Sequence, residues 1–562
     1  MFRDLARTAA QRAVSESRRQ AVMVATMTRA GIVRMHNPAR LALVGKALHD
    51  WGMGFAGGVR AQAALSPDNV AIIDEIGPLT WREIDERSTR LANALHDRGV
   101  GERDGVAVLC RNHRYFLEVS TALGKLGADI LYLNTAFAAP QIGEVCAREK
   151  PVAVVYDDEF EGLIDASGLE VPRFLGWDDG AVDRESAEDL IASGTATLPK
   201  PPTHFARPVI LTSGTTGTPK GAPRSEAGLD AAVALLSRLD FKYGDVVHIA
   251  APVFHTWGWA HLNLGMLLGS TMVLRRRFDP ADCLDAIEAN ACTGLVVVPV
   301  MLQRILALPP EQRSGDYSSL RTVAASGSAL PGDLATEWMD TFGDNLYNTY
   351  GSTEVAWATI ARPEDMRAAP GTAGIAPPNT VVKIVDEAGR ELPAGEAGRI
   401  FVGNSMLFEG YTGGGHKEIL DGLMSTGDVG RLDVEGRLFV EGRDDEMIVS
   451  GGENVFPKEV EDCLARHDSV LEVAAIGVDD ADFGKRLRAF VVLVQRDGDE
   501  DATTGALKDW VKDNLARFKV PRDFVYLDEL PRNATGKVLK RELAQWKTQG
   551  ETREETREEA EG

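Results

Sequence analysis

Strand-like and helix-like segments alternate from about Ser66 onward, and this alternation constrains the fold more than any other feature. The segment NVAIID is typical of a strand, and TWREIDERSTRLANALHDRG has helical spacing and ends on a glycine. The alternation continues through GVAVLC, YFLEVSTALGKLGA and DILYLN, and resumes through DVVHIA, STMVLR, GLVVVP and TVAASG. Strands that alternate with helices predict an α/β fold of layered, largely parallel sheets.

The chain has 562 residues, which is more than one hydrophobic core supports, so we expect several domains. After Pro377, short strands with glycine turns predict a small β-rich subdomain over about 377–442. A new α/β pattern follows and ends near Trp546. The expected organisation is a basic helical extension at 1–65, a large N-terminal domain at 66–442, a small mobile α+β domain at 443–546 and a charged, disordered tail at 547–562.

The composition excludes some classes of function. The 84 acidic and 61 basic residues give a formal net charge of -23, which disfavours non-specific binding of nucleic acid. No apolar run reaches the roughly 18 residues that cross a bilayer. The five cysteines form no CxxC pair, and their odd number predicts buried, reduced thiols and a cytoplasmic protein.

Residues 1–50 differ from the rest of the chain, because nine Lys or Arg residues face only three acidic ones. A basic amphipathic segment can lie on an anionic membrane, here the inner face of the cell membrane. The alternative is a helical extension that packs on its own domain or forms a subunit contact in a homodimer. The sequence leaves both open.

The stretch LTSGTTGTPKG follows the strand PVIL and combines glycines, hydroxyl groups and one lysine. Such a loop can aim backbone N–H groups at phosphate oxygens, whereas a flexible polar surface loop is the alternative. It is not the common P-loop, because Pro219 precedes the lysine and Gly221 follows it. The candidate phosphate-binding residues are Thr212, Ser213, Gly214, Thr215, Thr216, Gly217 and Lys220.

Two further motifs carry groups that suit a nucleotide, although each alone could be an ordinary turn. In NTYGSTE, the Tyr350 ring suits a purine, the Thr353 hydroxyl a phosphate and the Glu354 carboxylate a Mg²⁺ ion. In STGDVG, Asp428 can accept both hydroxyls of a ribose.

Together these motifs closely resemble the adenylate-forming superfamily, which includes acyl-CoA synthetases, luciferases and the adenylation domains of peptide synthetases. The resemblance runs from about Ser66 to Trp546 and favours the fatty-acyl-CoA synthetase branch, the long-chain fatty acid–CoA ligases. It implies ATP, Mg²⁺ and coenzyme A. A carboxylate first attacks the α-phosphate of ATP, and a thiol then attacks the acyl carbon and expels AMP. The motifs are LTSGTTGTPKG, NTYGSTE, STGDVG, GRDDEMIVSGGENVFPKEVE and PRNATGKVLKREL.

The resemblance also implies roles for single residues around the nucleotide. Tyr350 stacks on adenine with Gly351 beside it, Thr353 touches the α-phosphate, and Glu354 is the catalytic Mg²⁺ ligand. The residues implied to line the adenine site are Gly327, Ser328 and Ala329.

The remaining implied roles lie later in the chain. Asp428 and Arg443 hold the ribose, and Asp445 is the hinge. Gly452 borders the pantetheine tunnel of the second step. Lys537 is the catalytic lysine that contacts the substrate carboxylate and the α-phosphate.

The stretch PVFHTWGWAHLNLG resembles the acyl-site motif of the family. His255 matches a position near the reacting carboxylate. The absence of an aspartate favours an acid without an α-amine. Trp257 and Trp259 both match a gate for the acyl pocket, and Val300 lies in an apolar stretch that suits its wall. The alternative is that both tryptophans are core residues.

We expect a medium- to long-chain fatty acid as substrate, with an aromatic or terpenoid acid as the main alternative. Delivery to a carrier protein is less favoured, because no insertion is evident between Phe401 and Gly452. A non-catalytic binding protein should have lost Lys537 or Glu354, and both are present. The expected partners are the fatty acid, ATP and CoA, without nucleic acid.

Overall fold

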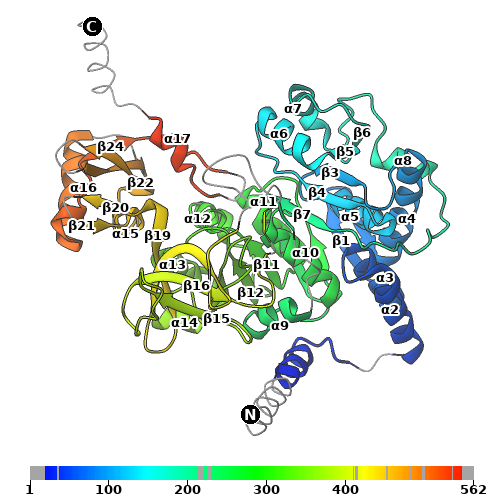
Figure 1. The fold of residues 1–562 in the computed structure, drawn as a ribbon, viewed down its shortest axis with the longest axis horizontal. Helices are drawn as coiled ribbons and strands as arrows, with labels where there is room; N and C mark the ends of the chain where they lie inside the picture. The colour runs from blue at the N-terminus through cyan, green and yellow to red at the C-terminus, as the bar shows by residue number, and fades with distance from the viewer. Residues whose placement is uncertain are drawn as a thin grey trace, which may run out of the picture. The chain divides into compact units, whose positions relative to one another are not determined.

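The computed structural model divides the chain into two compact units, which we call the large unit and the small unit (Figure 1). The large unit comprises Met1–Lys383 and Phe401–Thr426, and the small unit Ile384–Ile400 and Gly427–Gly562. The phosphate loop at 212–220, Gly452 and the tail at 547–562 lie outside the described residues. The structure describes residues 19–34, 37–211, 221–223, 229–408, 410–411, 416–450, 453–480, 484–495, 500–533 and 536–546.

The first sheet of the large unit has eight strands, and its six inner strands pair in parallel. The two outermost strands, β14 and β2, pair antiparallel to their neighbours. The order is β14 (Thr359–Ala361), β13 (Leu346–Tyr350), β12 (Thr322–Ala325), β11 (Gly294–Val297), β9 (Val246–Ile249), β10 (Thr271–Val273), β1 (Val70–Asp74) and β2 (Gly77–Thr80).

The second sheet has six strands, of which five run parallel and β8 pairs antiparallel to β7. Together the two sheets confirm the predicted α/β fold with largely parallel strands. The order is β6 (Arg173–Leu175), β5 (Ala153–Tyr156), β3 (Gly105–Leu109), β4 (Asp129–Tyr132), β7 (Pro208–Leu211) and β8 (Gly221–Pro223).

Helices form most of the connections between the parallel strands. Besides the helical residues 19–29, the described α-helices of the large unit are α2 (Pro38–Trp51), α3 (Phe55–Leu65), α4 (Trp81–Asp97), α5 (Arg114–Leu126), α6 (Ala139–Glu149), α7 (Glu161–Ala166), α8 (Ala187–Ser193), α9 (Leu229–Arg238), α10 (Thr256–Leu268), α11 (Pro280–Ala289), α12 (Pro299–Leu306), α13 (Gly332–Phe342) and α14 (Pro363–Ala368).

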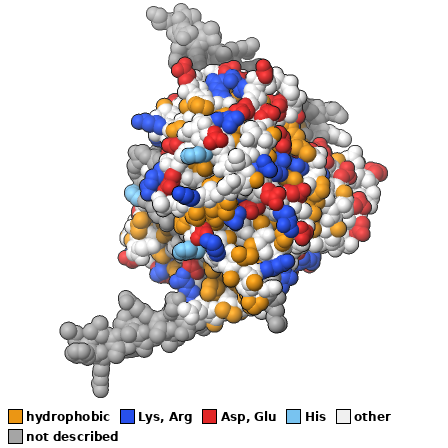
Figure 2. All heavy atoms as spheres, turned by 90° about the vertical axis from the view of Figure 1, so that its right-hand side faces the viewer, with side chains coloured by type: hydrophobic (Ala, Val, Ile, Leu, Met, Phe, Trp, Pro, Cys, Tyr) orange, Lys and Arg blue, Asp and Glu red, His pale blue; other side chains and the backbone are white. Residues whose placement is uncertain are grey.

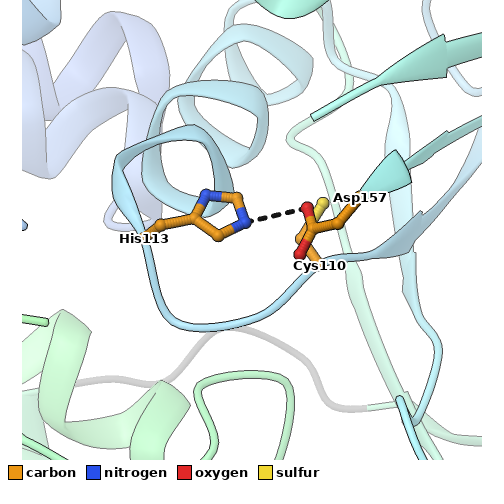
Figure 3. Close-up of side chains that lie close together, drawn as sticks. All are labelled: Cys110, His113 and Asp157. Atoms are coloured by element: carbon orange, nitrogen blue, oxygen red, sulfur yellow. Dashed lines mark hydrogen bonds and ion pairs between the residues drawn. The ribbon is translucent and has the colours of Figure 1, made fainter. Parts of the chain in front are cut away.

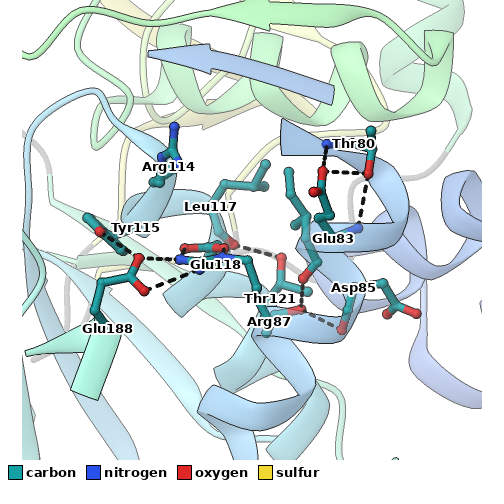
Figure 4. A network of polar contacts seen from close by, with 12 residues as sticks. Thr80, Glu83, Asp85, Arg87, Arg114, Tyr115, Leu117, Glu118, Thr121 and Glu188 are labelled. Carbon is teal, nitrogen blue, oxygen red and sulfur yellow. Dashed lines mark hydrogen bonds and ion pairs between the residues drawn. The ribbon is translucent and has the colours of Figure 1, made fainter. Parts of the chain in front are cut away.

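A network of charges joins α4, α5 and α8 (Figure 4). Arg87 on α4 donates to the fully buried Glu118 at 2.5 Å and to Glu188 on α8 at 2.5 Å. The Tyr115 hydroxyl also donates to Glu188, at 2.8 Å. Burial raises the pKa of Glu118, although Arg87 opposes this. A buried carboxylate is tolerated only when it is paired, so Arg87 fixes how these helices pack.

The later strands form two five-stranded sheets. The first, whose residues belong partly to each unit, has the order β15 (Val381–Val385), β16 (Gly398–Gly403), β18 (Leu423–Leu432) and β17 (Ile419–Leu420), with β19 (Leu438–Arg443) beside β18. The second lies in the small unit and has the order β21 (Glu453–Val455), β20 (Ile448–Ser450), β23 (Gly484–Leu493) and β22 (Val470–Asp480), with β24 (Asp523–Tyr526) beside β23. The described α-helices of the small unit are α15 (Pro457–Leu464), α16 (Glu500–Asn514) and α17 (Lys540–Ala544).

The described part of the basic extension packs on the large unit. Arg19 forms an ion pair with Asp230 of α9. The Tyr243 N–H donates to the Ala30 carbonyl oxygen at 2.8 Å, and the Arg34 guanidinium lies 3.3 Å from the centre of the Tyr243 ring. Residues 19–34 therefore pack against the rest of the large unit, which was one of the two alternatives for the basic extension. Among the described residues, no helix has the length and apolar character to cross a membrane.

The surface charges and the state of the cysteines can be compared with what the composition predicts. On the face drawn in Figure 2, acidic and basic side chains are interspersed with hydrophobic ones. All five cysteines are buried and unpaired, which confirms the prediction of reduced thiols.

Candidate active site

Loops after parallel strands carry most of the predicted site residues of the large unit. His255, Val300, Gly327 and Gly351 follow β9, β11, β12 and β13, respectively. In the other sheet, β7 leads into the predicted phosphate loop, which is outside the described residues. Ligands of α/β sheets bind in the crevice beyond the carboxyl ends of the strands. The topology thus brings the predicted adenine-site and acyl-site residues of the eight-stranded sheet to one edge.

The predicted adenine loop, Gly327–Ala329, begins with a turn that favours glycine. Gly327 has a φ of +95°, and a Cβ there would lie 3.2 Å from Val298 Cγ1. The preceding Ser326 Oγ donates to the Thr349 carbonyl oxygen at 2.7 Å. This bond ties the loop to β13, and Val298 places it beside the start of α12.

Tyr350 ends β13, and the chain then turns back to form β14. The Ala358 N–H donates to the Tyr350 carbonyl oxygen at 2.8 Å. A Cβ on Gly351 would lie 2.2 Å from the Ala356 carbonyl oxygen, so a side chain there would clash with the backbone of the turn. The turn that carries Thr353 therefore requires glycine at position 351.

Glu354, the predicted Mg²⁺ ligand, is held by a residue that sequence reasoning missed. The Tyr411 hydroxyl donates to Glu354 Oε1 at 2.7 Å. The Phe408 N–H donates to the Glu354 carbonyl oxygen at 2.8 Å, and the Phe408 and Tyr411 rings meet edge to face at 4.7 Å. A carboxylate that is oriented in this way is a suitable ligand for Mg²⁺.

His255 lies where the two sheets of the large unit meet. It precedes the first turn of α10, and its carbonyl oxygen accepts from the Trp259 N–H at 2.9 Å. The side-chain amide of Asn134, which follows β4, lies 3.4 Å from His255 Nε2. Burial lowers the pKa of His255 to about 4. The imidazole is therefore neutral near pH 7 and can orient a carboxylate but not neutralise it.

The two tryptophans of α10 face different neighbours. Residues two apart on a helix point about 200° from one another. Trp257 Nε1–H donates to the Val297 carbonyl oxygen at 3.1 Å, and its ring meets His261 edge to face at 4.2 Å. The Trp259 ring instead meets Phe55 of α3 at 6.0 Å. Trp257 is thus the one that lies at the carboxyl end of β11.

The predicted ribose pair and hinge meet in the small unit. Asp428 and Arg443 are directly opposite in β18 and β19, with 3.6 Å between Oδ1 and a guanidinium nitrogen. Arg443 Nε also donates to Asp445 Oδ1 at 3.0 Å. Burial acts to lower the pKa of Arg443, but the bond to Asp445 and the charge of Asp428 outweigh it, so the pKa is raised.

Lys537 lies on a turn of the small unit that its own backbone closes. Its N–H donates to Asn533 Oδ1 at 2.9 Å, and its carbonyl oxygen accepts from the Asn533 N–H at 2.9 Å. Arg532 donates to the Gly536 carbonyl oxygen at 2.6 Å and to Glu472 at 3.0 Å. The backbone that carries the Lys537 side chain is therefore well anchored.

Cys110, His113 and Asp157 form a buried cluster in the large unit (Figure 3). The Asp157 carboxylate accepts from His113 Nε2 at 2.8 Å, from the Arg111 N–H at 2.8 Å and from the Trp177 N–H at 3.2 Å. Burial raises the pKa of Cys110 well above its ordinary value, so the sulfur stays a thiol. Metals bind the thiolate, so we assign this cluster to packing.

This combination of fold and motifs defines a class, the adenylate-forming enzymes, whose two-unit architecture was predicted from the sequence. The chain matches the AMP-binding enzyme family over residues 59–412 and the AMP-binding enzyme C-terminal domain over residues 459–537. It belongs to the AMP-binding enzyme family. The predicted cofactors, ATP, Mg²⁺ and coenzyme A, are those of this family.

Several curated proteins are similar over most of their length. Indoleacetate–CoA ligase of Aromatoleum aromaticum is 33% identical over 494 residues, and feruloyl-CoA synthase of an Amycolatopsis species is 34% identical over 493 residues. Each match covers 86% of this chain and 96% of the relative. Fatty acid–[acyl-carrier-protein] ligase ScoC of Streptomyces coeruleorubidus is 30% identical over 502 residues, which cover 86% of this chain and 94% of ScoC.

Solved structures share the fold. The o-succinylbenzoate CoA synthetase of Bacillus subtilis, with its acyl-adenylate intermediate, has a TM-score of 0.76 and 28% identity, covering 87% of this chain and 98% of its own. The anthranilate CoA ligase AuaEII, with anthranoyl-AMP, has a TM-score of 0.78 and 24% identity, covering 87% and 96%, and shows the fold alone. These names do not single out the long-chain fatty acid branch that the sequence favoured.

Proposed function

We propose that this protein is an AMP-forming acid–CoA ligase for an aromatic carboxylic acid. Membership of the AMP-binding enzyme family supports the adenylation chemistry. Relatives at 33% and 34% identity are CoA ligases of indoleacetate and ferulate, which supports an aromatic acid over the fatty acid expected from sequence. The structural observation that carries this assignment is the fixed aromatic pair on α10, Trp257 against His261 at 4.2 Å.

In the first step, an oxygen of the substrate carboxylate attacks the α-phosphorus of ATP. The bond from this phosphorus to the bridging oxygen breaks, and pyrophosphate leaves with that oxygen. His255 orients the carboxylate as a neutral group. Tyr350 stacks on the adenine, Thr353 contacts the α-phosphate, and Lys537 neutralises charge on the transferring group. Glu354 would hold Mg²⁺, which would supply positive charge to neutralise the phosphate oxygens.

In the second step, the thiol of coenzyme A attacks the acyl carbon. The thiol proton is lost to solvent, the bond from the acyl carbon to the AMP oxygen breaks, and AMP leaves. Asp445 is the proposed hinge for the exchange of half-reactions, and Gly452 borders the path of the pantetheine. Arg443, through its ion pair with Asp428 and its hydrogen bond to Asp445, ties the ribose site to the hinge.

A fatty acid that is delivered to a carrier protein is the second candidate. One observation favours it, the 30% identity to the carrier-protein ligase ScoC. The two candidates differ in acid and in acceptor, so they can be separated in one assay.

The test is AMP release from the full chain with ATP, Mg²⁺ and a panel of acids, with coenzyme A, with holo-acyl-carrier protein or with neither. The panel contains phenylacetate, indoleacetate, cinnamate, octanoate and palmitate. We expect CoA-dependent AMP release with a higher kcat/KM for aromatic acids than for the fatty acids. Turnover of fatty acids alone, or release that requires the carrier protein, would contradict the proposal.

A further inference from the structure

His261 is a buried histidine on α10 with one ring nitrogen committed. Its side chain is 3% exposed, and Nδ1 lies 2.9 Å from the Trp257 carbonyl oxygen. A carbonyl oxygen only accepts, so Nδ1 carries the proton and Nε2 of the neutral ring is an acceptor. Burial lowers the pKa of His261 to about 4, which keeps the ring neutral near pH 7.

The other ring nitrogen of His261, Nε2, is a buried acceptor without a hydrogen-bond partner among the described residues. Buried polar atoms are nearly always paired, and leaving one unpaired costs free energy. A buried acceptor without a partner, on the same helix as the predicted acyl-site residues, is a feature expected of a group that pairs with the substrate.

Aromatic rings surround His261 on two sides. Trp257 meets it edge to face at 4.2 Å, and Phe241 meets it edge to face at 5.6 Å. Trp257 is itself fixed by its bond to the Val297 carbonyl oxygen. These rigid rings suit a flat ring better than a flexible alkyl chain.

The spacing along α10 matches a short aromatic acid. His255, proposed to orient the carboxylate, lies six residues before His261, which is about 9 Å along a helix that rises about 1.5 Å per residue. This length is close to that of an aromatic acid from its carboxylate to a substituent on the far side of the ring. A donor on that substituent would meet Nε2.

We propose that His261 Nε2 accepts a hydrogen bond from a hydroxyl or N–H group on the aromatic ring of the acid. His261 is then a specificity-determining residue, and the substrates are aromatic acids with a donor at the end of the ring far from the carboxylate. This inference rests on the proposed function. A site built to bond a substrate hydroxyl can reject the analogue without it by as much as about 10⁴–10⁵-fold.

Pairs of acids that differ only in the donor test this inference. We would measure kcat/KM of the full chain for 4-hydroxycinnamate, cinnamate and 4-methoxycinnamate, and for 4-hydroxyphenylacetate and phenylacetate. We expect the hydroxylated acids to be preferred by about tenfold or more. The methoxy acid, which keeps the oxygen but lacks the donor, should behave like cinnamate or worse.

Two variants test whether Nε2 causes the preference for hydroxylated acids. In His261→Phe the ratio of kcat/KM between the hydroxylated and the unsubstituted acid should fall to near one. His261→Gln, which retains an amide acceptor, should keep part of the preference. His248 offers a matched control, because it is also buried, its Nδ1 bonds the Val273 carbonyl oxygen at 2.9 Å, and burial lowers its pKa to about 4. His248→Gln should leave the preference unchanged.

The outcomes separate this inference from the proposed function. Equal use of both members of each pair by the wild-type protein, or an unchanged preference in His261→Phe, would overturn the inference alone. Absence of turnover with every aromatic acid would overturn the proposed function and the inference with it. The wild-type comparison needs no variant, so it stands even if a substitution prevents folding.

Discussion

The large and small units hold their predicted site residues in different ways. In the large unit these residues follow buried parallel strands, and hydrogen bonds orient the Trp257 ring and the Glu354 carboxylate. In the small unit they lie on a strand pair rich in charges and on a short turn, where Arg443 is shared between two aspartates. From this difference we propose that residues of the large unit select the acid and that residues of the small unit determine the rate of adenylation.

The largest effect should come from Lys537→Ala. Loss of one group that stabilises developing charge typically costs about 10²–10³-fold, so acyl-adenylate formation should fall by this factor. Because the residues proposed to select the acid lie in the large unit, the ratio of rates between two acids should stay at its wild-type value. Pyrophosphate release with two acids measures both quantities.

Two controls accompany this variant. Thioester formation from acyl-adenylate that is supplied directly should survive in Lys537→Ala far better than adenylation. Lys512→Ala on α16 removes an exposed lysine whose ion pair, among the described residues, is with Asp509, and it should be neutral. Near-normal adenylation by Lys537→Ala would refute its role.

Asp445→Pro should separate the half-reactions. Proline fixes φ near -65°, which restricts rotation of the backbone at the proposed hinge. We expect one half-reaction to fail while the other persists, measured as pyrophosphate release and as thioester formation. Asp445→Ala, which loses the bond to Arg443 but keeps a free backbone, is the control. Equal loss of both half-reactions in a folded Asp445→Pro protein would count against the hinge.

Tyr411→Phe should weaken Mg²⁺ binding without changing the choice of acid. The variant removes the 2.7 Å bond to Glu354, and a hydrogen bond to a charged group contributes about 1.5–3 kcal/mol. We expect calorimetry to show weaker binding of the Mg²⁺ complex of an ATP analogue by about tenfold or more, and adenylation to need more Mg²⁺. Tyr526→Phe, whose hydroxyl bonds Thr504 at 2.8 Å, is the control. Unchanged binding would show that Tyr411 does not position Glu354.

The smallest effect concerns the pH dependence of His255. Because burial lowers its pKa from 6.5 to about 4, the ring should stay neutral as pH falls from 8 to 5. The ratio of wild-type to His255→Phe activity should therefore be flat over this range and change only near pH 4. The unfolded chain takes up a proton below about pH 6.5 that the folded protein rejects, so His255 should reduce stability as pH falls from there to 4. A break in the activity ratio near pH 6.5 would contradict a neutral His255 with a lowered pKa.

Much of the fold could be predicted because its signals are local. The strand predicted at NVAIID is β1, and the helix predicted from Thr80 is α4, where Thr80 and Glu83 cap each other. The nucleotide motifs are also local, because each is a continuous run of residues around a turn. The division of the β-rich region between the units was harder to predict. Ile384–Ile400 belongs to the same compact unit as the residues from Gly427 onward, and this grouping depends on contacts between segments that are distant in the sequence.

The parts of the site that sequence reasoning missed depend on distant contacts. Tyr411 reaches Glu354 across 57 residues, and no spacing in the sequence links the two. The sequence could not choose between Trp257 and Trp259, because both are aromatic and only their neighbours differ. His261 resembles an ordinary core histidine until its bond to the Trp257 carbonyl oxygen leaves Nε2 as an unpaired acceptor.

A competition in one reaction tests the central claim most directly. The full chain would receive ATP, Mg²⁺, coenzyme A and an equimolar mixture of 4-hydroxycinnamate, cinnamate, octanoate and palmitate, and mass spectrometry would identify the thioesters formed early. An aromatic-acid ligase that pairs its substrate with His261 should yield 4-hydroxycinnamoyl-CoA as the main product. A mixture dominated by octanoyl-CoA or palmitoyl-CoA would contradict this account and return the protein to the fatty-acid class.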